Sequence, residues 1–299
     1  MMSKIKIHQI LFILTSLVII YACALQHAMS FGSYSYEIPE FSVAIVVVSL
    51  ILIGTIGVAH GALDGKIIWE HSSRYSVRLK LYSIYLILAF SGAILWYFFP
   101  LGGLAVLLIM SSFHFGVSDL NFLKNIRISL KLYWGFAMTF LPLLFKEEVV
   151  SELFFDLTSM VIYPEIIYTI RIMVILSIIL FFLSILMMRR AGKDENSSEL
   201  KLLCIEMGLL IALAYYLNPL IWFSFYFCGL HGLRAIIDSE FKIIPDLIWL
   251  ILFTAPISLM IFLIEWDYNF NSLLVVFPIL ASLTVAHMLL PRIKNYVKS

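Results

Sequence analysis

The sequence predicts an all-α protein, a polytopic membrane helix bundle of about ten transmembrane helices with both termini in the cytoplasm. Of its 299 residues, 62% are hydrophobic and 13% are charged, whereas a soluble domain is about 45–50% apolar and about 25% charged. Apolar runs of nearly membrane-spanning length recur along the whole chain. Because no polar stretch is long enough for a soluble domain, residues 1–299 are predicted to form one membrane-embedded domain.

Each predicted span is an apolar run bounded by charged residues or a turn. The first run could instead be a signal peptide, but it is at or beyond the ~7–15 apolar residues expected of one, so we interpret it as a helix. The fifth run is short and contains Pro142, and the mixed stretch 146–165 after it predicts an interfacial helix. The ten predicted spans are Ile5–Leu25, Phe41–Leu63, Leu81–Phe98, Pro100–Leu120, Leu132–Leu144, Ile166–Met188, Leu200–Leu217, Leu220–Ile237, Leu247–Ile264 and Ser272–Leu290.

The basic residues fix the predicted orientation. All but two of the 20 lysines and arginines lie at the chain ends or in every second loop, the exceptions being Lys146 and Arg171. Cytoplasmic loops are enriched in basic residues, so the chain is predicted to be a multi-pass protein of the cell (inner) membrane. The formal net charge of +1 indicates no nucleic-acid partner. The three cysteines have no pair spacing and are interpreted as small core residues: Cys23, Cys204 and Cys228.

Four histidines occupy equivalent places near the cytoplasmic ends of spans two, four, eight and ten. Each is followed by a basic residue within 3 to 10 positions, which places all four roughly 5–15 Å from the same membrane edge at a rise of ~1.5 Å per residue. A single histidine of this kind usually hydrogen-bonds a neighbouring helix. Four at one depth instead predict a shared metal site, because ionisable groups are costly in a membrane. The predicted ligands are His60, His114, His231 and His287.

Carboxylates lie in the same layer. A metal-bound imidazole usually donates its other N–H to a carboxylate or carbonyl group, and Asp64 and Glu206 are the predicted acceptors. Asp119 and Asp238 are expected to face the cytoplasmic boundary instead. Imidazole ligands suit iron, copper, zinc and nickel. Iron(II) with open positions would suit O2 chemistry, while a haem held by two histidines is the alternative.

Aromatic side chains crowd the two central histidine helices. They predict a slot for a flat, apolar substrate, although lipid-facing bulk and interfacial anchoring explain them equally well. The residues predicted to line this slot are Phe113, Phe115, Trp222, Phe225 and Tyr226.

Four motifs resemble the Brp/Blh family of bacterial and archaeal β-carotene 15,15′-dioxygenases. They are His-Gly-Ala-Leu-Asp at 60–64, His-Phe-Gly-x-x-Asp at 114–119, Phe-Cys-x-x-His at 227–231 and His-Met-Leu at 287–289. The resemblance implies a membrane enzyme that uses Fe(II) and O2 to cleave the central double bond of β-carotene into two molecules of all-trans-retinal, which a rhodopsin could then bind. By position, the resemblance implies that the metal ligands of the family correspond to His60, His114 and His231.

The chain departs from the family pattern at one position. The family has a second histidine four residues after the one at 231, where this sequence has Ala235. Either His287 completes the ligand set, or the site has three ligands, or the activity is lost or altered. Two functions of other classes stay open, namely a haem-binding electron-transfer protein and a carotenoid or lipid carrier without catalysis. A transporter would favour internal repeats, and the sequence shows none.

Overall fold

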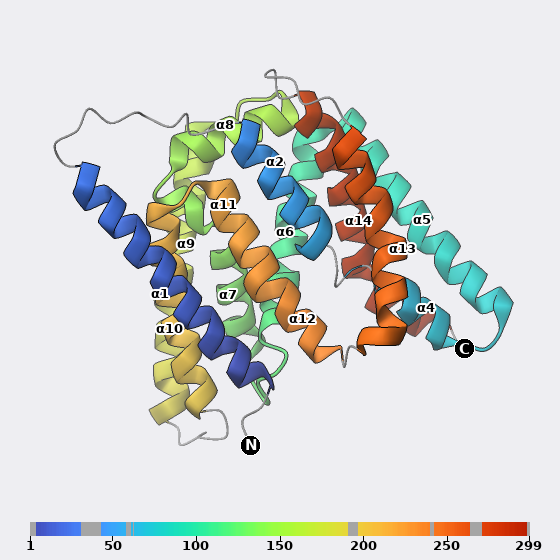
Figure 1. The fold of residues 1–299 in the computed structure, drawn as a ribbon, viewed down its shortest axis with the longest axis horizontal. Helices are drawn as coiled ribbons and strands as arrows, with labels where there is room; N and C mark the ends of the chain where they lie inside the picture. Colours follow the sequence, from blue (N-terminus) through green and yellow to red (C-terminus); the bar gives the residue numbers. More distant parts are fainter. Residues whose placement is uncertain are drawn as a thin grey trace.

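The computed structural model describes residues 4–30, 43–57, 61, 63–190, 197–239, 242–263 and 271–297. All regular structure within these residues is helical, with no strand, which confirms the predicted all-α class. The long helices run alternately up and down in one bundle (Figure 1). The first turn of α1 (Lys4–Ser30) and the last turn of α14 (Asn271–Tyr296) lie at the same end of it. That this end faces the cytoplasm stays a prediction.

Several helices are long and apolar enough to cross a membrane, which indicates a membrane protein. The described residues contain five of them, or up to six if the bent segment α7 to α8 is one span. The predicted total of about ten therefore stays a prediction. The five segments are Lys4–Ala28, Tyr75–Phe98 (α5), Pro100–Asp119 (α6), Pro164–Arg190 (α9) and Pro219–Asp238.

The predicted spans leave a basic loop, residues 64–80, between the second span and the third, and the structure instead has helix over most of it. The short helix α4 (Asp64–His71) is followed after three residues by α5, which begins at Tyr75. Lysine and arginine are good helix formers, so their charge does not end a helix. Arg78 is held inside this corner, where its Nε donates to the carbonyl oxygen of Ser72 and its guanidinium lies 3.9 Å from the ring centre of Trp69.

Two predicted spans contain a π-helical turn that the sequence did not predict. The second consists of α2 (Val43–Leu52) and η1 (Ile53–Gly57) within the described residues. The eighth consists of α11 (Pro219–Ser224), η4 (Phe225–Gly232) and α12 (Leu233–Asp238). Such turns are rare and occur frequently at functional sites.

Glycines let these two π-helical turns touch. A Cβ atom at Gly57 would lie 2.5 Å from Cδ1 of Phe227, and one at Gly232 would lie 3.5 Å from the carbonyl oxygen of Ile56. Small residues allow close backbone approach between membrane helices. The end of η1, three residues before His60 in the sequence, is thus packed against η4, which contains His231.

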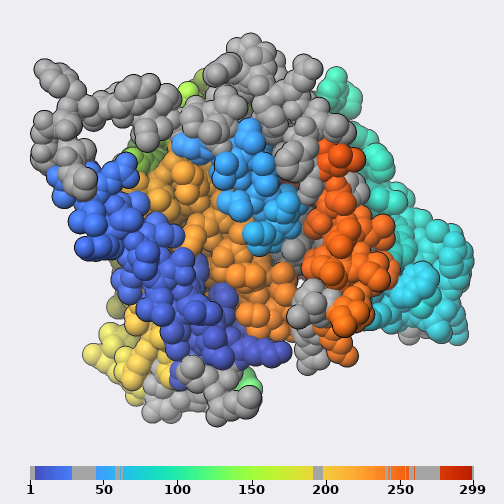
Figure 2. Space-filling model, in the orientation of Figure 1, coloured from blue at the N-terminus to red at the C-terminus, as the bar shows by residue number. Residues whose placement is uncertain are grey.

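The remaining helices enclose this pair. They are α7 (Ile128–Phe140), η2 (Leu141–Leu144), α8 (Glu147–Thr158), α10 (Ser197–Tyr216) and α13 (Ile243–Leu263). The helix predicted within 146–165 is present as α8, which is bent by 105° from the preceding helix. On α9, Arg171 pairs with Glu147 at the start of α8. Figure 2 shows α1 crossing the face formed by α10 to α12, and α1 contacts both α10 and α12.

The backbones of α6 and α7 come closest together at Gly116 and Gly135. A Cβ atom would lie 1.9 Å from the carbonyl oxygen of Lys131 if placed at Gly116, and 1.7 Å from that of Ser112 if placed at Gly135. Backbone atoms cannot rotate away, so the two helices would have to separate. This contact sets the position of His114, which lies two residues before Gly116.

We predict that Gly116→Ala lowers the free energy of unfolding by about 1–3 kcal/mol or more, because overpacking forces the backbone to shift. The measurement is thermal unfolding of the purified protein in detergent. The matched control is Gly208→Ala on α10, where no atom lies within 4 Å of the added Cβ. The control should keep or slightly raise the melting temperature, since alanine is the better helix former. Equal melting temperatures for both variants would contradict the close packing.

Candidate metal centre

Three of the four predicted histidines lie together inside the bundle. The ring centre of His114 on α6 is 5.1 Å from that of His231 on η4 and 5.3 Å from that of His287 on α14. His231 is fully buried, and the side chain of His287 is 17% exposed. Residues from three distant parts of the sequence therefore come together, with the rings of His231 and His287 each beside that of His114.

The fourth predicted ligand, His60, lies outside the described residues. Its neighbour Gly61 is described, and a Cβ atom there would lie 3.6 Å from Nδ1 of His287. The chain next to His60 therefore reaches the same cluster.

Asp119 holds His231 in place. Nδ1 of His231 donates to Oδ1 of Asp119 at 2.7 Å. The other carboxylate oxygen accepts from Tyr226 Oη at 2.7 Å and from Trp134 Nε1 at 2.9 Å. An ionised carboxylate only accepts hydrogen bonds, so the proton of His231 lies on Nδ1 and its Nε2 can act as a ligand. The expectation that Asp119 faces the boundary is wrong, because the carboxylate is fully buried.

Asp64 plays the same part for His287. Nδ1 of His287 lies 2.9 Å from both carboxylate oxygens of Asp64, and the hydroxyl of Tyr85 interacts with the same carboxylate. Asp64 is buried at the start of α4. Each of these two histidines is thus oriented by a buried aspartate that also contacts a tyrosine.

The other two carboxylates take different positions. Glu206 on α10 does not contact a histidine in any hydrogen bond of the described residues, and its Oε1 accepts from Nη2 of Arg234 at 2.7 Å. Within the described residues, Glu206 is connected to His231 through Arg234 and Asp119. Asp238, at the end of α12, accepts from the amide of Asn121 at 2.6 Å in an exposed position.

The ring spacing fits a metal ion. With a metal–nitrogen distance of ~2.1 Å, two imidazole rings on one ion have centres roughly 4.5–5.5 Å apart. The separations of 5.1 and 5.3 Å from His114 fall within this range. Among the described residues, no three histidine, cysteine or acidic side chains are close enough to complete a metal site by themselves. A complete ligand set therefore requires the predicted contribution of His60 or some movement of the three rings.

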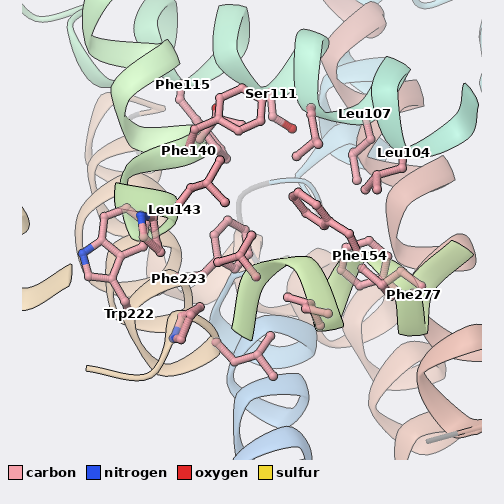
Figure 3. A pocket seen from close by; sticks show the side chains of 18 residues that line it. Leu104, Leu107, Ser111, Phe115, Phe140, Leu143, Phe154, Trp222, Phe223 and Phe277 are labelled. Carbon is pink, nitrogen blue, oxygen red and sulfur yellow. The ribbon is translucent and has the colours of Figure 1, made fainter. Parts of the chain in front are cut away.

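An apolar cavity adjoins the cluster, between α6, α8, α11 and α14 (Figure 3). Its volume is about 120 Å³, close to the ~150 Å³ of an apolar cavity that binds benzene. Phe115 belongs to the wall and lies 4.8 Å, ring centre to ring centre, from His231. Most of the wall consists of apolar side chains. The lining residues labelled in Figure 3 are Leu104, Leu107, Ser111, Phe115, Phe140, Leu143, Phe154, Trp222, Phe223 and Phe277.

The five aromatic residues predicted to form a slot are spread over different surroundings. Phe115 and Trp222 line this cavity, and Phe225 lines a second apolar groove between α2 and α11. Tyr226 stacks on Trp222 and donates to Asp119. Phe113 is 43% exposed and lies below the guanidinium of Arg292. The sequence did not single out η2 and α8, which supply much of the wall, because they belong to the short fifth span and to the mixed stretch predicted as an interfacial helix.

Comparisons with known proteins agree on one family. A sequence profile described as Beta-carotene 15,15'-dioxygenase matches residues 51–293. The chain is 33% identical over 198 residues to a protein named "Beta-carotene 15,15'-dioxygenase" from an uncultured marine bacterium, 66A03. The alignment covers 62% of this chain and 66% of that relative, slightly under two thirds of its length. No solved structure matches.

The fold and the site together define a helical membrane protein with a histidine cluster beside an apolar cavity. The match over 51–293 includes every histidine of the cluster. The chain belongs to the Beta-carotene 15,15'-dioxygenase family, which confirms the resemblance found in its motifs.

We predict that Asp119→Asn lowers the free energy of unfolding by about 1–3 kcal/mol, because an amide has one acceptor oxygen and leaves a buried donor without its partner. Thermal unfolding in detergent measures the effect. The matched control is Asp238→Asn, an exposed aspartate that should give a change within about 0.5 kcal/mol. The assignment of Asp119 to the buried network would be wrong if both variants unfolded like the wild type.

Proposed function

We propose that this protein is an iron(II)-dependent dioxygenase that cleaves the central 15,15′ double bond of β-carotene with O2. The observation that supports this most is the cluster of His114, His231 and His287, in which buried carboxylates orient two of the rings. Membership of the family supports the reaction and the substrate. The products would be two molecules of all-trans-retinal. One C=C bond breaks, each carbon gains one oxygen atom, and no proton or further reductant is consumed.

The candidate ligands of the iron are His60, His114, His231 and His287. O2 reacts slowly with carbon compounds because their electrons are all paired. Iron(II) bound by imidazoles would activate O2 for this reaction. Because position 235 is alanine, we propose that His287 completes the set in this chain. Its support is the position of the ring, 5.3 Å from His114 and hydrogen-bonded to Asp64.

The protein residues have two tasks beside ligation. Asp64 and Asp119 keep the protons of His287 and His231 on Nδ1, so that each Nε2 stays available in a fixed direction. The apolar cavity excludes water and takes the ring at one end of the carotenoid, while Phe115 separates that ring from His231. This arrangement needs no general acid or base, in keeping with a reaction in which no proton is transferred overall.

The remaining parts of the proposal follow from the substrate. β-Carotene is a hydrocarbon and dissolves in the lipid bilayer, so a multi-pass protein of the cell membrane can take it up sideways. Retinal formed there could pass to a rhodopsin. A haem protein would instead show a Soret absorption band after purification, and a carrier would leave the carotenoid intact.

We predict that His114→Ala and His287→Ala each abolish retinal formation in a carotenoid-accumulating host, because each removes a ligand. Retinal is measured by extraction and chromatography, and iron by elemental analysis of the purified protein. Both variants should also contain less iron than the wild type.

The matched control is His27→Ala, at an exposed position on α1 far along the chain from the motifs. This variant should retain retinal formation and iron. Full retinal formation in His287→Ala would show that the site works with fewer ligands, and full formation in His114→Ala would refute the metal centre.

We predict that Leu153→Trp, which fills the cavity from α8, reduces cleavage of β-carotene by at least tenfold while the iron content stays unchanged. The matched control is Phe155→Trp on the same helix, whose side chain is 47% exposed and does not line the cavity. The measurement is the rate of β-carotene cleavage by each purified variant in detergent with added iron. Unimpaired cleavage by Leu153→Trp would place the substrate elsewhere.

A further inference from the structure

A buried ion pair lies behind the histidine cluster and has no part in ligation. Nη2 of Arg234 on α12 donates to Oε1 of Glu206 on α10 at 2.7 Å, and both side chains are at most 2% exposed. The buried amide of Gln9 from α1 lies near Glu206. Removing two charges from water usually costs more than their attraction returns, so a buried pair is weak evidence for stability by itself. The position of the Arg234–Glu206 pair behind the histidine cluster therefore indicates a role other than stability.

Arg234 connects this pair to the cluster. Its Nη1 donates to the backbone carbonyl oxygen of Asp119 at 3.2 Å, while its Nη2 holds Glu206. Asp119 in turn accepts from Nδ1 of His231. One guanidinium thus ties the end of α6 to α10, and the tied residue is the one that orients His231. The planar fork of arginine can bridge two such acceptors, whereas the single ammonium of lysine cannot do so in the same way.

The charges of the described cluster also fit a divalent cation. The carboxylates are Asp64, Asp119 and Glu206, and Arg234 is the guanidinium among them. With neutral imidazoles, three negative charges and one positive charge leave two negative charges. A divalent ion at the histidines would balance them, and buried charges are stable only when they are compensated.

We propose that Glu206 and Arg234 are positioning residues that act through Asp119 on His231 and so set the affinity of the metal centre. The proposal rests on the proposed function, because it needs a metal ion at the histidines. Glu206 keeps the guanidinium in place, and the guanidinium fixes the carbonyl end of α6. Neither residue touches the metal or the substrate.

The test is a titration of the full-length apo protein in detergent with Co(II), whose visible spectrum reports its ligands. Arg234→Lys keeps the charge and loses the bridge, and Glu206→Gln keeps the shape and loses the charge. Each should weaken Co(II) binding by about tenfold or more, the range known for residues that support metal ligands. Arg234→Lys should also shift the Co(II) absorption bands. The matched control is Glu147→Gln on α8, which removes the ion pair with Arg171 on α9. This variant should leave the affinity for Co(II) and the Co(II) spectrum unchanged.

The outcomes are distinguishable. If the wild type binds no Co(II), the metal centre of the proposed function fails, and this inference fails with it. If the wild type binds Co(II) and both variants bind it within twofold with the same spectrum, the pair has no positioning role. If both variants lose the folded state while Glu147→Gln keeps it, the pair serves folding alone, which also overturns the proposal. Weaker binding at an unchanged melting temperature of the apo protein supports it.

Discussion

The hydrogen bond between His231 and Asp119 is the interaction on which the site depends. Both side chains are fully buried, so the carboxylate must be satisfied entirely by protein donors. Three side chains provide them, from His231, Tyr226 and Trp134. They bring η4, the end of α6 and α7 to one point. The direction of the His231 ring is therefore a consequence of helix packing rather than of local sequence.

Close packing fixes the rest of the geometry. The glycine contact between α6 and α7 positions the helix that carries both His114 and Asp119. The π-helical turns η1 and η4 meet at Gly57 and Gly232, directly beside two of the motifs. A single extra residue in a helical turn rotates everything after it, so these turns determine which side chains face the cluster. The site therefore depends on backbone contacts that lie some distance from the imidazoles.

Much of the architecture could be predicted from hydrophobicity alone. Apolar runs predicted helices α6 and α9 near their observed bounds and α5 at its end but not at its start, because burial in lipid demands a continuous apolar stretch. Counting along spans four, eight and ten predicted His114, His231 and His287 at one level, and ring distances of 5.1 and 5.3 Å from His114 agree with this. Asp64 could be predicted beside a histidine because the motif places it at the end of its span.

The partners of the other carboxylates could not be predicted. Asp119 ends α6, and a helix end usually faces solvent, but here Leu120 and Leu123 bury the following turn. Glu206 was expected beside a histidine. Nothing in the sequence indicates that it would instead pair with Arg234 on a different helix. The cavity lies beside the bend before α8; Pro142 and the mixed stretch 146–165 predicted a break there, but not its angle of 105°. Pairing between helices and bends within them depend on the whole bundle, and hydrophobic patterns do not encode them.

X-ray absorption at the iron edge of the purified, iron-loaded protein tests the central claim most directly. Imidazoles that converge on one ion predict a ligand sphere of nitrogen and oxygen only, at ~2.0–2.2 Å, with the multiple-scattering pattern of several histidine rings. The pattern should weaken in His114→Ala. A spectrum with sulfur ligands, with the signature of a porphyrin, or without histidine scattering would contradict a shared histidine centre.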